Sequence, residues 1–141
     1  MSDPLYKTPL LRLAANAAGA GRLADPHCTG AAHNLACGDK VTVDLALEDG
    51  RIAGIALETK ACVLTQASAS ILGADATGLN RDEIALLRAA VAEMLTGAAP
   101  PPAPFNTYSH FDGVADHPGR HRCVLLPIEA VLAAFDENNL E

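Results

Sequence analysis

The sequence predicts an α+β fold in which one helix precedes a short antiparallel sheet and further helices pack on one face of that sheet. Two observations support this. Apolar residues alternate along a stretch that is interrupted by an Asp-Gly turn, and segments with helical spacing of apolar residues lie before and after it. The chain has 141 residues, enough for one domain with a modest core, and we expect residues 1–141 to form a single domain.

The N-terminal part predicts one helix and one extended segment. Leucine and alanine recur at helical spacing over residues 5–18, and Gly19 and Gly21 are expected to end that helix. Residues 25–34 have no helical period, so we expect an extended segment at a sheet edge.

A β-hairpin is expected over residues 41–57. Apolar side chains alternate with Thr42 and Asp44 over 41–47, as in a half-buried strand. The turn at 48–51 contains Asp-Gly, which tolerates positive φ, and residues 52–57 return as the partner strand.

Two helices are expected next. Residues 63–72 are rich in alanine and serine, and we interpret them as a helix that begins just after Cys62. Residues 80–95 form the clearest helix, because Asn80 and Glu83 have the spacing of a capping box and Gly97 follows the last turn.

The C-terminal part predicts a loop and a final helix. Residues 98–104 contain four prolines and cannot form regular structure. Residues 120–135 return to a helical pattern, which we expect to be interrupted before Pro127, a residue suited to the first turn of a helix.

Composition excludes several classes of function. The net charge is −7, from 17 acidic and 10 basic side chains, which argues against nucleic acid or an anionic membrane as the main partner. The N-terminus lacks the pattern of a signal peptide and no stretch is long and apolar enough to span a membrane, so we expect a cytoplasmic protein. In that compartment the four cysteines are expected to be reduced.

The most informative side chains are Cys37, Asp39, Cys62 and Cys123, because thiolate and carboxylate groups bind zinc and iron. Pairing within the hairpin brings the first three together at one sheet edge, whereas Cys123 reaches them only if the last helix docks there. The alternative is that these cysteines are small core residues, which is the interpretation we prefer for Cys28. Three histidines near Cys123 are alternative ligands (His110, His117 and His121).

Three motifs resemble one known family. Residues 34–41 (NLACGDKV) resemble the Asn-Pro-x-Cys-Gly-Asp signature of the U-type iron–sulfur cluster assembly proteins, which comprise IscU, SufU and the N-terminal domain of NifU. Residues 61–70 resemble the second cysteine of that family with its Ala-Ser-x-Ser helix start, and residues 118–126 resemble the third. The similarity covers nearly the whole chain.

The resemblance implies a three-stranded antiparallel sheet with about five helices, and zinc held by Cys37, Asp39, Cys62 and Cys123. Arg122 precedes the third cysteine where IscU has a histidine, and Arg120 also fits the SufU pattern, so the chain is more similar to SufU. Leu35 stands where the family usually has proline.

The SufU resemblance implies a sulfur acceptor, with Cys37 taking persulfide sulfur from a cysteine desulfurase and passing it to a SUF scaffold, and with Arg120 as an accessory residue. The IscU resemblance implies instead a scaffold that assembles a 2Fe–2S cluster on the same ligands for apo-protein acceptors. We expect a monomer or weak dimer that binds neither nucleic acid nor membranes.

Overall fold

The computed structural model describes residues 7–36 and 38–139 of the chain. Along the chain the elements are α1 (Thr8–Asn16), β1 (Cys28–Asn34), β2 (Asp39–Glu48), β3 (Arg51–Lys60), α2 (Val63–Asp75), α3 (Arg81–Met94), the 3₁₀ helices η1 (Phe105–Asp116) and η2 (Pro118–Arg120), and α4 (His121–Asn139). None of the helices in the described part of the chain is long and apolar enough to cross a membrane.

The three strands form one antiparallel sheet in the order β1-β2-β3, which confirms the α+β prediction. The expected hairpin is present with its turn at Asp49-Gly50, and both residues have positive φ. Val41 lies opposite Thr59, so the start of β2 and the end of β3 meet at one end of the sheet, as predicted. The expected extended segment is β1, which pairs with β2 from Cys28↔Leu45 to Asn34↔Asp39.

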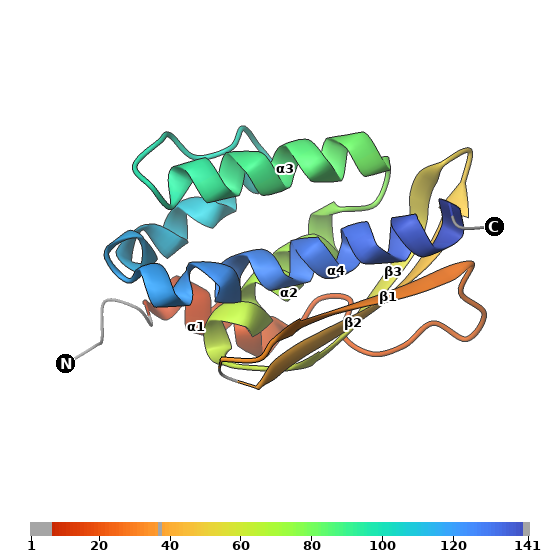
Figure 1. The fold of residues 1–141 in the computed structure, drawn as a ribbon, viewed down its shortest axis with the longest axis horizontal. Helices are drawn as coiled ribbons and strands as arrows, with labels where there is room; N and C mark the ends of the chain where they lie inside the picture. The colour runs from red at the N-terminus through yellow and green to blue at the C-terminus, as the bar shows by residue number, and fades with distance from the viewer. Residues whose placement is uncertain (1–6, 37, 140–141) are drawn as a thin grey trace.

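Helices α2 and α4 cover one face of the sheet, which we call the inner face (Figure 1). The alternating apolar residues of β2, Val41, Val43 and Leu45, are fully buried under them. α4 approaches β1 so closely that a Cβ on Gly30 would lie 2.1 Å from the backbone nitrogen of Ala134. Only glycine allows this approach, which seats α4 directly on the strand.

The segment between α1 and β1 partly covers the outer face of the sheet. As a result, the environment of Asp44 differs from the one that the sequence predicts. The alternation predicts an exposed polar side for β2, yet the Asp44 side chain is fully buried. It accepts hydrogen bonds from Arg22 Nε (2.7 Å), the Leu23 N–H (3.0 Å) and the Thr29 hydroxyl (2.7 Å). These partners replace the water that a carboxylate would lose on burial.

The predicted capping box of α3 is confirmed. The Asn80 side chain accepts from the Glu83 N–H at 2.8 Å, and the Glu83 carboxylate accepts from the Asn80 N–H at 3.1 Å. One face of this helix is apolar and buried (Ile84, Leu87, Val91, Met94 and Leu95). Residues 98–104 contain no helix or strand, as expected, and η1 follows them.

α4 continues through Pro127, so the predicted interruption before that residue is wrong. Proline has no N–H, and its ring disturbs the carbonyls one turn earlier in a helix. Here the Ser68 hydroxyl of α2 donates to the Val124 carbonyl at 2.7 Å, which supplies a partner from another helix at this turn. Burial of Pro127 and its neighbours against the core then holds the two halves in line.

α1 is shorter than the predicted helix 5–18. It begins at Thr8, while residues 5 and 6 lie outside the described part of the chain. It ends at Asn16 because Ala17 has the left-handed conformation (φ 47°), two residues before the glycine that was expected to stop it.

Candidate functional site

Three of the four predicted ligands meet at the end of the sheet where β2 begins and β3 ends. The ligand atoms of Asp39, Cys62 and Cys123 all lie within 4.8 Å of one another. Asp39 is the first residue of β2, Cys62 follows β3, and Cys123 lies in the first turn of α4. Docking of α4 on β1 therefore brings the third cysteine to the hairpin.

Cys62 is the N-cap residue of α2, as the sequence predicted. At a helix N-terminus the aligned peptide dipoles favour a thiolate. Thr65 occupies the third helical position, from which a side chain reaches back to the N-cap. Its hydroxyl lies 3.5 Å from Cys62 Sγ and 3.4 Å from Asp39 Oδ2, so it contacts two of the four predicted ligands.

Sequence reasoning did not identify Thr65 as part of the site. Its position three residues after a cysteine at a helix start is the signal by which it could have been found. The Thr65 side chain is fully buried, so the hydroxyl acts within the site rather than toward solvent.

Cys123 is held at the buried side of the site. It is 1 % exposed, and Asn34 Nδ2 approaches its Sγ at 4.0 Å. Asn34 is itself buried and lies opposite Asp39, where β1 ends and β2 begins. It belongs to the motif that carries the family resemblance, but no pattern in the sequence indicates that it contacts the third cysteine.

The two described thiols of the site influence each other. The hydrogen bond between Cys123 and Cys62 lowers the pKa of Cys62, and the Thr65 hydroxyl lowers it further. Burial and the negative charge of Asp39 oppose this lowering of the Cys62 pKa. The arrangement therefore favours a thiolate at Cys62 next to the Cys123 thiol.

Cys28 lies apart from this site. It is 3 % exposed in the core, and burial raises the pKa of its thiol. The interpretation of Cys28 as a core residue is confirmed by its burial.

The other residues that the sequence predicts for the site are Cys37, Arg120 and the histidines near Cys123. Cys37 lies outside the described residues, although its flanking motif residues Asn34 and Asp39 are at the site. Arg120 ends η2, three residues before Cys123, and is half-buried. The His121 ring contacts the Ala115 carbonyl at 3.1 Å, and no histidine joins the ligand cluster among the described residues.

The donor set suits zinc or iron. Two thiol sulfurs and one carboxylate oxygen are ligands that both metals accept. Tetrahedral zinc, with Zn–S bonds of about 2.3 Å, holds such donor atoms roughly 3.5–3.8 Å apart. The three donors here lie within 4.8 Å of one another, so side-chain adjustments of about 1 Å would close the site on an ion of this size.

Comparisons with known proteins agree on one family. The family model described as the NifU-like N terminal domain matches residues 5–121. A curated relative, the iron–sulfur cluster assembly scaffold protein IscU of Thermotoga maritima, is 27 % identical over 122 residues, which is 86 % of each chain.

Two solved structures are similar over almost their full length. The N-terminal part of a nitrogen-fixing NifU-like protein from Brucella abortus matches with a TM-score of 0.91 and 34 % identity, over 99 % of this chain and 97 % of that one. A putative scaffold protein for the SUF system from Fervidobacterium islandicum has a TM-score of 0.82 and 22 % identity, over 96 % and 99 % of the two chains, a likeness that shows the fold.

Proposed function

This chain belongs to the family of the NifU-like N-terminal domain, a family of iron–sulfur cluster assembly proteins, and we propose that it is a zinc-bound sulfur acceptor. In this proposal a cysteine desulfurase supplies persulfide sulfur, and a SUF scaffold receives it. The observation that carries the proposal is the convergence of Asp39, Cys62 and Cys123 within 4.8 Å at the N-terminus of α2.

We assign the metal to Asp39, Cys62, Cys123 and Cys37, the ligand set that the family resemblance implies. Bound zinc would keep these thiols deprotonated at neutral pH without redox chemistry of its own. Thr65 would orient the Asp39 carboxylate and the Cys62 sulfur through its hydroxyl, and Asn34 would support Cys123. Arg120, three residues before Cys123, is the accessory residue for docking of the desulfurase.

The proposed transfer resembles thiol–disulfide exchange. The Cys37 thiolate attacks the terminal sulfur of the desulfurase persulfide, and a new S–S bond forms on Cys37. The S–S bond of the donor breaks at the same time, and the desulfurase cysteine leaves as a thiolate. One S–S bond replaces another, so the step needs no oxidant or reductant.

A scaffold role is the second candidate, and the IscU relative favours it because that protein is named a scaffold. In this role the same four side chains would hold a 2Fe–2S cluster as cargo and release it to apo-proteins. Thiolates from Cys37, Cys62 and Cys123 are suitable ligands for such a cluster. Asp39 would be the weaker ligand at which release begins.

Desulfurase turnover tests the acceptor role. Addition of wild-type protein should raise the turnover of a cysteine desulfurase, and the Cys37→Ala variant should fail to do so. Cys28→Ala is the matched control, since it removes a buried thiol away from the site, and it should stimulate as well as wild type. Equal stimulation by the Cys37→Ala variant would refute sulfur acceptance at that residue.

Metal analysis separates the two roles. Protein isolated without oxygen should contain near-stoichiometric zinc and lack visible absorbance if it is the acceptor. Iron with acid-labile sulfide and a visible spectrum would favour the scaffold role instead.

A further inference from the structure

The end of β3 next to the site has a backbone edge that no described residue covers. The Leu57 N–H donates to the Gly19 carbonyl (2.8 Å), and the Leu57 carbonyl accepts from the Gly21 N–H (3.1 Å), so Leu57 turns its backbone away from β2. Backbone direction alternates along a strand, so Thr59 also turns its N–H and C=O outward. Among the described residues, none forms a backbone hydrogen bond with Thr59 at that edge.

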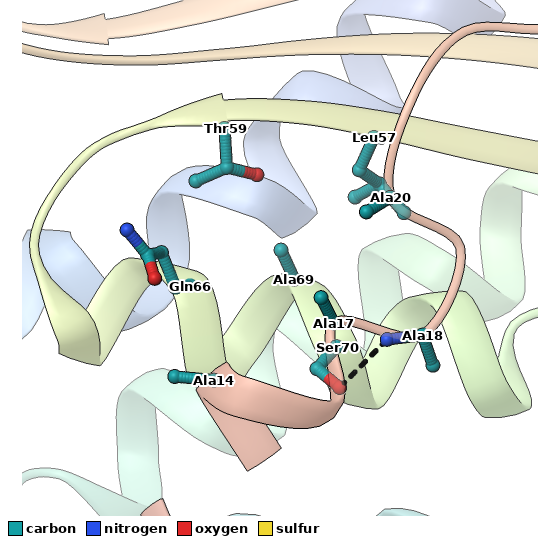
Figure 2. Close-up of a pocket in the computed structure, with 9 residues that line it drawn as sticks. All are labelled: Ala14, Ala17, Ala18, Ala20, Leu57, Thr59, Gln66, Ala69 and Ser70. Atoms are coloured by element: carbon teal, nitrogen blue, oxygen red, sulfur yellow. Dashed lines mark hydrogen bonds between the residues drawn. The ribbon is translucent and has the colours of Figure 1, made fainter. Parts of the chain in front are cut away.

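A pocket lies directly under this edge on the inner face. Figure 2 shows Thr59 above an opening bordered by small side chains, among them Ala14 of α1, Ala17 just after α1, and Ala69 of α2. The pocket volume is about 210 Å³, and its walls are mainly apolar. An engineered cavity of about 150 Å³ accommodates benzene, so this space is sufficient for an aliphatic side chain.

The opposite, outer face of the same strand end is positively charged. Lys60 lies directly across from Lys40, and Lys40 lies across from His33, so the three exposed side chains form a row over the three strands. Neither lysine forms an ion pair with a described residue, and like charges opposite each other destabilise a sheet. Glu58, the next residue on this face, is attracted to the Arg22 guanidinium. An acidic ligand would relieve the repulsion between the lysines.

We propose that the β3 edge at Thr59 binds an extended segment of a partner protein, in which apolar side chains alternate with acidic ones. The added strand would bond to the free backbone of Thr59. Its side chains alternate between faces, so one apolar side chain would enter the pocket while its acidic neighbours would face Lys60 and Lys40. The three features therefore specify one pattern of ligand: the edge gives the main-chain bonds, the pocket selects an aliphatic residue, and the lysines select carboxylates.

Thr59 lies three residues before Cys62, so a segment bound at this edge would hold its protein beside the cluster of Asp39, Cys62 and Cys123. The identification of that protein as a donor or recipient of sulfur rests on the proposed function, whereas the docking edge itself rests on the three features above.

A peptide titration tests the docking edge. The probe is an acetylated and amidated hexapeptide of alternating glutamate and valine, added to ¹⁵N-labelled protein and followed by amide chemical shifts. We expect saturable shifts centred on Thr59, Lys60 and Ala69. A peptide with lysine in place of glutamate should bind about fivefold more weakly or worse, since it meets two cations.

Two variants and a control locate the binding. Ala14→Leu should fill the pocket, and Lys60→Glu should reverse the charge beside the edge, and each should weaken binding of the glutamate–valine peptide by about fivefold or more. Arg81→Glu makes the same change in net charge at an exposed ion pair with Asp136, away from the edge, and should leave binding unchanged.

Several outcomes would overturn the proposal. Absence of shifts at Thr59 and Lys60, or equal shifts with the lysine peptide, would exclude an acidic strand at this edge. A Thr59 amide protected from hydrogen exchange in the free protein would mean that the chain itself covers the edge. Chemical-shift changes at this edge that depend on protein concentration, without added peptide, would identify a second copy of the chain as the occupant.

The same titration on Cys37→Ala protein separates this proposal from the proposed function. Peptide binding should persist in that variant while stimulation of the desulfurase is lost. Absence of stimulation by wild-type protein would refute sulfur acceptance and leave the docking edge to be decided by the titration.

Discussion

Replacing Asp44 with asparagine should destabilise the protein strongly for a single isosteric change. The fully buried carboxylate accepts from Arg22 Nε at 2.7 Å and Nη2 at 3.0 Å, and also from the Leu23 N–H and the Thr29 hydroxyl. Asparagine keeps one acceptor oxygen but places an NH₂ group against donors. Loss of a charge-assisted hydrogen bond costs about 1.5–3 kcal/mol, and the Arg22 guanidinium is half-exposed and can be rehydrated.

We therefore expect the free energy of unfolding to fall by about 2–3 kcal/mol at pH 7. For a domain of this size, that corresponds to a Tm lower by about 8 °C. Urea denaturation and thermal melts followed by circular dichroism measure both quantities. Asp136→Asn is the control, because it removes the same charge from an exposed ion pair with Arg81 of the same length, 2.7 Å, and should cost less than about 1 kcal/mol.

The pH dependence gives a second test of the same reasoning. The hydrogen bond from Arg22 lowers the pKa of Asp44 in the folded protein, and the bonds from Thr29 and Leu23 add to this. Stability from this carboxylate is thus fully present above the unfolded-state pKa of about 3.9, and it is lost as the pH falls through the lower folded-state pKa. The stability difference between wild type and Asp44→Asn should be constant from pH 7 to about pH 5 and shrink below about pH 4. A difference under about 0.5 kcal/mol at pH 7 would refute the assigned role of this buried carboxylate.

Three further changes test the site and its support. Asp39→Ala should keep the fold and slow the loss of metal to a chelator, because a carboxylate is a more labile ligand than a thiolate; an unchanged off-rate with only a lower Tm would make Asp39 structural. Thr65→Val should weaken metal affinity by about tenfold in a chelator competition while Thr65→Ser retains it, and equal affinities of the two variants would remove the hydroxyl from the site. Gly30→Ala should cost about 3 kcal/mol or more in urea denaturation, since its Cβ would overlap the backbone of α4. Gly54→Ala, whose Cβ would meet only a side chain at 3.6 Å, should cost much less, and a similar cost for both would contradict this account of α4 docking.

Local patterns predicted most of the fold because they depend on neighbours in the chain. The alternation around Asp49-Gly50 is sufficient to define a hairpin and so to bring the start of β2 to the end of β3, although a β-bulge at Ala46 and Leu47 shifts the register by one residue and places Val41 opposite Thr59. The spacing of Asn80 and Glu83 likewise defines the start of α3. Such signals rest on backbone periodicity and short-range hydrogen bonds, which tertiary packing leaves intact.

Predictions failed where a distant segment supplied the missing partner. Pro127 would break a helix in isolation, but Ser68 of α2 and the surrounding core allow α4 to continue through it. Asp44 would face water in an isolated strand, but Arg22 and Leu23 cross the sheet and bury it.

The sequence by itself determined the α+β class, the hairpin and the candidate ligands, because each depends on residue type and spacing within one segment. Only the tertiary structure decided that Cys123 joins Asp39 and Cys62, because that contact depends on where α4 settles on the sheet. The close approach at Gly30 sets that position, and it involves residues about one hundred positions apart in the chain.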